Sequence, residues 1–228
     1  MNAVPMNSVA MVNHHPAPEL LTAFSAGSLQ LSQALCVSTH IEFCNICQNN
    51  LRRLNSMGSA LFETLPPQQV SAQLKSNVMS MLDDSPQAEA VPARRHSRVP
   101  RALRQFIPED YDSLPWTILS PSIRSATLCV DNNGARVEMV RIKPGGEVAT
   151  HTHTGDEYTV IVEGSFSDEK GIYREGDFLL RDGSHQHKPV ATKDRECICL
   201  TVTDAPIRFT GFFGRLLNPF IRKRYLPV

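Results

Sequence analysis

The stretch His40-Ile-Glu-Phe-Cys44-Asn-Ile-Cys47 decides how the first part of this chain folds. A helix brings residues three and four apart onto one face, so this spacing predicts that one imidazole and two thiolates point together. Tetrahedral zinc sites take four nitrogen and sulfur donors, and Cys-x-x-Cys with a His one turn earlier is typical of them. We therefore predict that His40, Cys44 and Cys47 bind zinc, and that a fourth ligand completes the site.

The fourth zinc ligand has three candidates, which are His14, His15 and Cys36. Cys36 lies one turn before His40 on the same helix, and four ligands from one straight helix would form a row rather than a tetrahedron. A metal that stabilises a small domain ties separate segments together, so His15, before the first helix, is the better candidate. The alternative is ordinary core packing, since free cysteine behaves as a small hydrophobe.

The composition is that of an ordinary globular protein. The chain has 228 residues, of which 41% are hydrophobic and 20% charged, and Lys+Arg and Asp+Glu are equal at 23 each. This balance gives no overall attraction to nucleic acid or to an acidic membrane surface. The sequence shows neither a secretory signal nor an apolar run of about 18 residues, so we expect a cytoplasmic protein with no membrane span. In that reducing compartment, metal binding or redox chemistry suits the six cysteines better than disulfides.

Helical periodicity dominates the first third of the chain. Residues 18–26 predict a short helix, Ser28 can cap the next helix, and residues 51–65 keep helical phase until two prolines end it. A fourth helix is predicted for residues 68–82, with apolar residues along one side. That side either faces a core or docks on a partner helix. Its apolar residues are Val70, Leu74, Val78, Met81 and Leu82.

The composition changes after the fourth helix. Residues 83–105 are rich in Pro, Ala, Ser and Arg, which indicates a linker whose arginines are solvated rather than bound to phosphate. After this linker the periodicity falls to two, in short runs separated by Gly, Asp and Asn turns. Such runs indicate an all-β sandwich or barrel. The predicted strands are residues 136–143, 158–166, 177–181, 196–202 and 206–212.

A second group of metal-binding residues lies in the β half. His151 and His153 occupy positions i and i+2 of a strand, so they project from the same face. Glu157 on the next hairpin arm can approach them, and His187 comes from a later hairpin. Three imidazoles and one carboxylate suit zinc, manganese, iron or nickel equally. The alternative is a metal-free barrel. His185, two residues before His187, is less suited to be a fifth ligand than to support the ligands or to face solvent.

Cys197 and Cys199 also share one strand face. Extended i and i+2 positions are too far apart and too parallel for an easy disulfide. The pair is therefore either buried packing or an oxidisable thiol pair near the metal.

The order Gly145-x5-His151-x-His153-x3-Glu157-x6-Gly164, followed by Gly176 and His187, resembles the two motifs of the cupin superfamily. The first motif is complete. The second departs from the family pattern only at turn positions. The resemblance implies a double-stranded β-helix, or jelly-roll, barrel. The departures are Asp182 where the family has Pro, Ser184 where it has Gly, and Ala191 where it has Asn.

A metal-binding helical segment joined to a cupin resembles the ChrR family of zinc-dependent anti-sigma factors. His14-His15-Pro16 and His40-x3-Cys44-x2-Cys47 stand as they do in that family. Together with the composition, the resemblance predicts a zinc-binding helical anti-sigma domain at 1–84, a Pro/Arg-rich linker at 85–105, and a cupin domain with a C-terminal tail at 106–228. The resemblance itself leaves the linker and the tail unaccounted for. It also implies two zinc sites, with iron, manganese or nickel as alternatives in the cupin. Their ligands would be His15, His40, Cys44 and Cys47, and then His151, His153, Glu157 and His187.

The same resemblance implies a function. The helical domain would bind an extracytoplasmic-function type sigma factor and block its contact with RNA polymerase, with the helix at 68–82 as part of the grip. The cupin would sense singlet oxygen or a related peroxide stress and cause release. A flexible linker that lets the β domain cover or leave the helical domain is compatible with such a switch, as is chemistry at Cys197 and Cys199.

Two other classes of function are alternatives to an anti-sigma factor. A metal-dependent cupin enzyme, such as a dioxygenase or isomerase, needs open coordination positions and a placed acid or base. Its nearest candidates, Tyr158, Asp156 and His185, are not clearly catalytic, so we expect no enzyme. A zinc-finger DNA binder would need a strongly basic face, whereas Arg52 and Arg53 are the only nearby pair.

Overall fold

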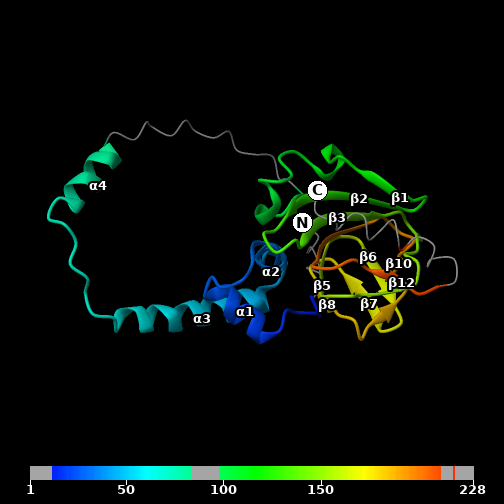
Figure 1. Cartoon of the computed structure of the whole chain (residues 1–228), viewed down its shortest axis with the longest axis horizontal. Helices are drawn as coiled ribbons and strands as arrows, with labels where there is room; N and C mark the ends of the chain where they lie inside the picture. Colours follow the sequence, from blue (N-terminus) through cyan, green and yellow to red (C-terminus); the bar gives the residue numbers. More distant parts are fainter. Residues whose placement is uncertain (1–11, 84–97, 212–217, 219–228) are drawn as a thin grey trace, which may run out of the picture.

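The computed structural model describes residues 12–83, 98–211 and 218. Helices occupy the first part of the described chain and antiparallel strands the second, which confirms the expected combination of a helical segment and an all-β domain (Figure 1). The α-helices are α1 (Pro18–Ser25), α2 (Leu31–Phe43), α3 (Asn45–Glu63) and α4 (Leu74–Asp83).

The turn between α1 and α2 differs from the prediction. Ser28 does not cap α2, because its hydroxyl donates to Ala23 O at the end of α1 and the N-cap position belongs to Gln30. Gly27 adopts φ 67°, a left-handed conformation that glycine tolerates best. The turn therefore completes the end of α1 and leaves the start of α2 without a side-chain cap.

The predicted continuous helix through the first metal-binding motif is wrong. Cys44 has φ −114° and ψ 103°, so α2 ends at Phe43 and α3 begins at Asn45. The Cys44 sulfur atom also accepts a hydrogen bond from the backbone N–H of Cys47 at 3.4 Å, as the side chain of an N-cap residue does. Because the chain turns at Cys44, the metal-binding residues come from two helices and do not form a row.

The β domain contains one large sheet and two small ones, and every strand pair is antiparallel. The large sheet has the order β1-β2-β3-β11-β5-β8, and the small sheets have the orders β10-β6-β7 and β12-β4-β9. The strands are β1 (Thr117–Ser120), β2 (Ile123–Val130), β3 (Arg136–Ile142), β4 (His151–Thr152), β5 (Glu157–Glu163), β6 (Ser165–Asp168), β7 (Gly171–Arg174), β8 (Phe178–Arg181), β9 (Gln186–His187), β10 (Val190–Ala191), β11 (Cys197–Thr203) and β12 (Arg208–Phe209).

The strand prediction needs three corrections. The run at 158–166 is two strands, because Gly164 has φ 75° and separates β5 from β6. The run at 206–212 contains only the two residues of β12. The sequence pattern does not predict strands β1, β2 and β7, whose exposed and buried positions do not alternate regularly, or β10, which has only two residues.

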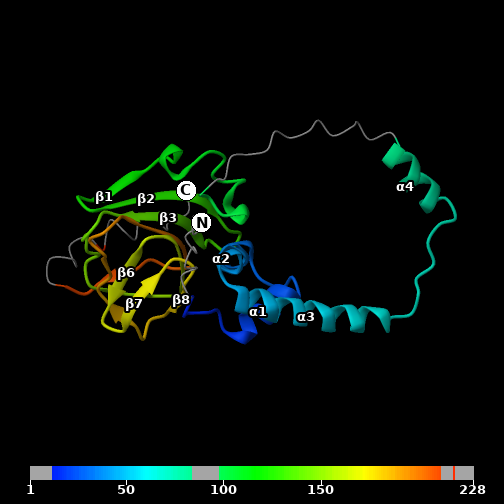
Figure 2. The ribbon, with the colours of Figure 1, turned by 180° about the vertical axis from the view of Figure 1, so that it is seen from behind.

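The large sheet separates two hydrophobic cores. Outward-facing residues of β5 and β11, such as Val160 and Leu200, pack in one core with Leu35 and Val37 of α2. Inward-facing residues such as Ile161 lie in the other core, inside the barrel. Figures 1 and 2 show α2 lying beside the barrel. The helical segment is thus docked on the β domain through a shared core.

The last part of the predicted linker is packed rather than extended. Val99 and Leu103 are fully buried in the shared core, and residues 101–103 form a short 3-10 helix. The Glu42 carboxylate accepts the backbone N–H groups of Arg101 and Ala102, both at 2.9 Å. Residues 84–97 of the linker lie outside the described part of the chain, and the domain bounds stay a prediction.

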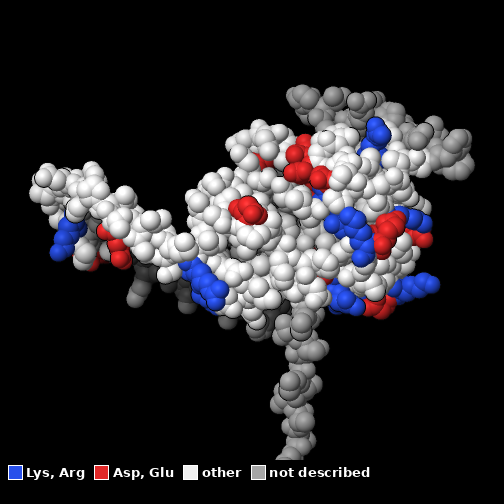
Figure 3. Space-filling model, turned by 90° about the horizontal axis from the view of Figure 1, so that it is seen from below, with Lys and Arg blue, Asp and Glu red and all other residues white. Residues whose placement is uncertain are grey.

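The second half of α3 and the whole of α4 project away from this body (Figures 1 and 2). No residue of α4 is buried, and α3 buries only Cys47 in its first turn. Figure 3 shows that uncharged atoms make up most of the surface of the projecting part. Among the described residues, no helix is both long enough and apolar enough to cross a membrane.

Two candidate metal centres

The first cluster contains His15, His40, Cys44 and Cys47 and lies at the junction of α2 and α3. The ligand atoms of these residues all lie within 4.8 Å of one another. The sulfur atoms of Cys44 and Cys47 are 3.3 Å and 3.6 Å from His15 Nδ1. Two imidazoles and two thiols from separate segments fit a structural zinc site.

The protonation of this cluster also suits a metal ion. Burial lowers the pKa of His40 to about 4, so its imidazole is neutral. His40 Nδ1 bonds to Gly176 O at 2.7 Å and must carry the proton, while the buried Nε2 has no hydrogen-bond partner. Burial, followed by the neighbouring Cys44 thiol, raises the pKa of Cys47 to about 12. A cation would reverse that shift and hold the thiolate form.

The other two candidates for the fourth ligand lie outside this cluster. Cys36 is fully buried against the β domain, with its sulfur 4.0 Å from Tyr158 O, and burial raises the pKa of its thiol. His14 turns toward Asp177, and its Nδ1 lies 3.4 Å from that carboxylate. The structure therefore brings His15, and neither Cys36 nor His14, to the other three residues.

The second cluster contains His151, His153 and His187 inside the β domain, where β4 pairs with β9. His187 Nε2 lies 3.0 Å from His151 Nε2 and 3.2 Å from His153 Nε2. His151 Nδ1 bonds to Ala149 O at 2.9 Å, and His187 Nδ1 bonds to Asp168 at 3.2 Å. With Nδ1 of these two rings so engaged, three Nε2 atoms face a common point that suits a divalent metal.

Glu157 lies beside this cluster rather than in it. Its Oε2 is 3.7 Å from His153 Nδ1, on the side of the ring opposite the shared Nε2 atoms, and its Oε1 accepts the Thr159 hydroxyl. Burial raises the pKa of the Glu157 carboxyl to about 7. His185 bonds to Asp182 at 2.8 Å and is not in the cluster. Metal ligation by Glu157 stays a prediction.

Asp168 is the residue at this site that sequence reasoning missed. Its side chain is fully buried and accepts hydrogen bonds from His187, the Tyr173 hydroxyl at 3.0 Å and Arg181 at 3.3 Å. Burial would raise the pKa of this carboxyl, but hydrogen bonds from the Lys170 backbone and these side chains lower it below its usual value. No spacing in the sequence links residue 168 to His187, so only the fold could reveal the pair.

Cys197 and Cys199 lie in the interior core of the barrel with residues such as Ile161 and Phe166. Their sulfur atoms are 3.6 Å apart, which is a contact distance and not a bond. The pKa of the Cys199 thiol lies well above its usual value, chiefly because of its hydrogen bond with Cys197 and secondly because of burial. The geometry is that of packed, protonated thiols, and a redox role stays a prediction.

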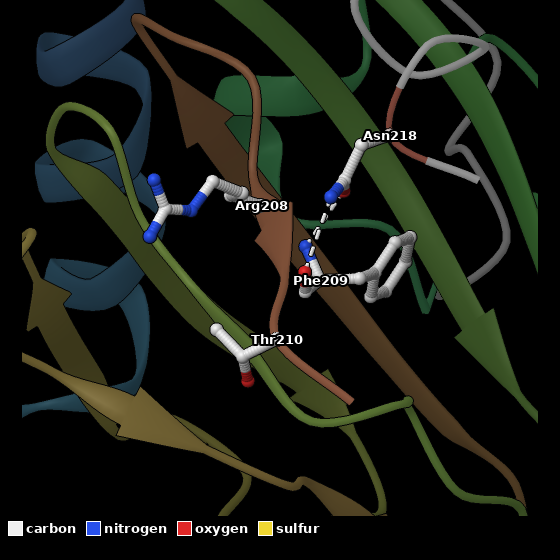
Figure 4. Close-up of a pocket in the computed structure, with 4 residues that line it drawn as sticks. All are labelled: Arg208, Phe209, Thr210 and Asn218. Carbon is white, nitrogen blue, oxygen red and sulfur yellow. Dashed lines mark hydrogen bonds between the residues drawn. The ribbon is translucent and has the colours of Figure 1, made fainter. Parts of the chain in front are cut away.

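A pocket lies at β12 and is lined by Arg208, Phe209, Thr210 and Asn218 (Figure 4). The Asn218 side chain pairs with the backbone of Phe209, accepting from its N–H at 2.9 Å and donating to its carbonyl at 3.1 Å. Arg208 and Thr210 complete the lining. The Phe209 ring lies 6.3 Å from the His151 ring, centroid to centroid, so β12 helps to shield this histidine from solvent.

The predicted partner-binding residues lie on the projecting part of the chain. The fourth helix begins at Leu74 rather than at residue 68, and Val70 precedes it. A short helix that buries no residue is marginal, which explains the shorter extent. The side chains of this set are all exposed: Val70, Leu74, Val78, Met81 and Leu82.

Together, these features define a β domain with a three-histidine cluster, joined to a helical segment with a His2Cys2 cluster, and both clusters could hold a metal ion. A family model described as "ChrR Cupin-like domain" matches residues 105–206. The curated anti-sigma-E factor ChrR of Cereibacter sphaeroides is 34% identical over 212 residues, which cover 92% of this chain and 99% of that protein. A chain in the crystal structure of Rhodobacter sphaeroides SigE in complex with the anti-sigma ChrR is 31% identical, with a TM-score of 0.74. That match covers 85% of this chain and 99% of the other.

The chain therefore belongs to the ChrR family of anti-sigma factors. This membership confirms the resemblance drawn from the motifs and the cupin fold of the β domain. It also confirms that the chain is a regulatory protein and not an enzyme.

Proposed function

We propose that this chain sequesters an extracytoplasmic-function type sigma factor through its projecting helices and releases it when the cupin domain receives an oxidative signal. The observation that carries the proposal is the apolar surface of α3 and α4. Leu61 and Phe62 near the end of α3 are 69% and 76% exposed. Contiguous exposed apolar surface of this kind marks a protein-binding site, and a relative of this chain has been crystallised with SigE.

Helix α4 has the spacing of a helix that binds in a groove. Leu74, Val78 and Leu82 recur at intervals of four residues, so they share one face. An amphipathic helix can place such a face in an apolar groove of a partner. Residues 64–73 between α3 and α4 contain no α-helix, so the two helices can reach different parts of the same sigma factor.

The His2Cys2 cluster would fix the orientation of the docking surface relative to the rest of the chain. His15, His40, Cys44 and Cys47 would hold zinc, which supplies a cross-link between the start of the chain and two helices. Because Cys44 and Cys47 flank the first turn of α3, this cross-link fixes the direction in which the exposed half of α3 projects. A sigma factor would then meet a rigid helix and not a flexible one.

The cupin domain would bind a metal through His151, His153 and His187, with Glu157 as the further ligand of the proposal. Zinc is the proposed metal, and iron, manganese and nickel suit the same donors. The proposed signal is singlet oxygen or a related peroxide. Because a sigma factor acts on RNA polymerase, the proposal places the chain in the cytoplasm.

A series of contacts that joins the two clusters supports signalling from the cupin. His187 contacts Asp168, Asp168 accepts the Tyr173 hydroxyl, and the Tyr173 ring packs edge-on against His14 at 4.8 Å between centroids. His14 is the neighbour of His15 in the first cluster. Since the helical segment and the barrel share a core, a signal can pass through packed side chains and does not require the linker to swing.

The docking surface is tested with a double variant, Leu61→Ala with Phe62→Ala. The full chain is mixed with a sigma factor from the same organism, and affinity and sigma-dependent transcription are measured. Removing two central apolar side chains should weaken binding by about 30-fold or more and restore transcription. The control is Ile118→Ala on β1, which is 69% exposed but lies on the β domain. Unchanged binding by the double variant would contradict the proposal.

A further inference from the structure

Two histidines of the first cluster are positioned by one turn of the β domain. The turn lies between β7 and β8 and consists of Glu175, Gly176 and Asp177. Gly176 O accepts the Nδ1–H of His40 at 2.7 Å, although the two residues are 136 positions apart. Asp177 Oδ1 accepts the backbone N–H of Asn13 at 2.8 Å and that of His14 at 3.0 Å. The segment that ends at His15 and the helix that carries His40 are therefore anchored at the same place.

The conformation of Gly176 and the burial of Asp177 allow the turn to make these contacts. Gly176 has φ 90°, and an added Cβ would lie 2.7 Å from Phe43 Cβ, so only glycine fits here. The Asp177 side chain is 1% exposed, and its Oδ2 accepts the backbone N–H of Arg174 at 2.8 Å. One buried carboxylate thus accepts three backbone N–H groups, two from the helical segment and one from its own hairpin.

A backbone bond extends the same anchor. The N–H of Phe178, the first residue of β8, donates to His14 O at 3.0 Å. The backbone of His14 is thereby held on both its N–H and its carbonyl, one residue before His15. Little freedom is left for the His15 backbone, and the His15 ring is directed toward the thiols of Cys44 and Cys47.

We propose that Asp177 and the Gly176 carbonyl are positioning groups of the helical metal site, supplied by the β domain. They do not touch the metal position and act through His15 and His40. The Gly176 carbonyl selects the tautomer of His40 that leaves Nε2 as the ligand atom, and Asp177 fixes the segment before His15. The inference rests on the metal-binding part of the proposed function and adds that the cupin domain sets the affinity of the helical site.

The test is the substitution Asp177→Asn in the full chain, with Co²⁺ as the probe metal. Asparagine has the same size but one acceptor oxygen in place of two, so the three N–H groups cannot all be satisfied. Co²⁺ bound by Cys44 and Cys47 gives thiolate-to-metal charge-transfer absorption, which a site of three imidazoles cannot give. Chelator competition followed at this absorption should show affinity weaker by about 10- to 100-fold.

The control is Asp131→Asn, which removes a contact of the same kind at a different place. Asp131 Oδ2 accepts the backbone N–H of Ser32 at 2.9 Å, so this carboxylate also holds α2 to the β domain. Ser32 lies at the start of α2, two helical turns before His40. Asp131→Asn should keep the Co²⁺ affinity within about threefold of the unmodified chain, because it touches no segment next to a ligand.

Three outcomes would overturn the inference. Asp177→Asn could keep the unmodified affinity while folded by circular dichroism, or Asp131→Asn could lose as much affinity as Asp177→Asn, which would indicate docking alone. If Asp177→Asn fails to fold, the variant Asn13→Pro takes its place, because it deletes one N–H donor and leaves the buried carboxylate intact. The third contradicting outcome is a Co²⁺ affinity of this variant equal to that of the unmodified chain. Absence of the charge-transfer absorption from the unmodified chain would instead contradict metal binding in the proposed function.

Discussion

At the scale of residues, the two clusters orient their imidazoles in the same way. His40 and His151 each bond a backbone carbonyl through Nδ1, and His187 bonds the Asp168 carboxylate through Nδ1. This arrangement places the proton on Nδ1 and leaves Nε2 as the donor for a metal. Burial lowers the pKa of His40 and His151 to about 4, so both rings stay neutral near pH 7.

The pKa of Glu157 leads to a prediction for the metal-free chain. Burial raises this pKa from 4.5 to about 7. The stability that the protonated carboxyl contributes is fully present below the unfolded pKa, and it is lost as pH rises through about 7. Glu157→Gln mimics the protonated form, so the variant should be more stable than the unmodified chain at pH 8 by about 2 kcal/mol.

Urea unfolding of both metal-free chains at a series of pH values measures this difference. The buried histidines titrate in both chains, so their effect cancels in the comparison. The two stability curves should meet near pH 4.5 and separate as the pH rises toward 7. A constant difference across this range would show that Glu157 does not titrate there.

At the scale of elements, α2 and α4 have opposite environments. Helix α2 is packed between the other helices and the barrel and buries Leu35, Val37 and His40. Helix α4 buries no residue, and an isolated helix of its 10 residues is marginal in water. Stable structure in α4 therefore requires a partner.

Hydrogen exchange should show this difference directly. In the free chain, amides of α4 are expected to exchange within seconds, while those of α2 stay protected. Adding the sigma factor should protect α4 and leave α2 unchanged, because α4 gains buried contacts whereas α2 does not. Mass spectrometry of peptides from both helices makes the measurement. Strong protection of α4 in the free chain, or none in the complex, would contradict its role in docking.

At the scale of the whole molecule, the β domain is both the platform of the helical segment and the proposed sensor. The large sheet presents Val160 and Leu200 to the helices, while its other face lines the barrel interior. The histidine cluster lies in that barrel, and Asp168 and Tyr173 connect it to His14. A change at the cupin metal is therefore expected to alter the helical segment through this packing.

Removing the cupin ligands should separate inhibition from release. The double variant His151→Ala with His153→Ala should still inhibit sigma-dependent transcription, because the docking helices and the His2Cys2 cluster are intact. Release by singlet oxygen from a light-activated photosensitiser should be lost. The control is His185→Ala, which removes a histidine outside the cluster and should respond as the unmodified chain does. Normal release by the double variant would place the sensor elsewhere in the chain.

Local spacing in the sequence by itself determined which neighbouring metal-binding side chains come together. The intervals between His40, Cys44 and Cys47 bring their side chains together even though the helix breaks, because each interval still spans about one helical turn. His151 and His153, two positions apart, likewise lie close together, although β4 ends at Thr152 and His153 follows the strand rather than sharing its face as predicted. These features follow from helix and strand geometry, which acts over a few residues.

Only the tertiary structure decided which distant groups complete the sites. The contact of Gly176 with His40, the bonds of Asp177 to the backbone of Asn13 and His14, and the pairing of Asp168 with His187 join residues far apart in the sequence. Such contacts arise when sheets and helices pack, and no local periodicity encodes them. The break at Cys44 has the same origin, since α2 follows the barrel surface whereas α3 turns away from it.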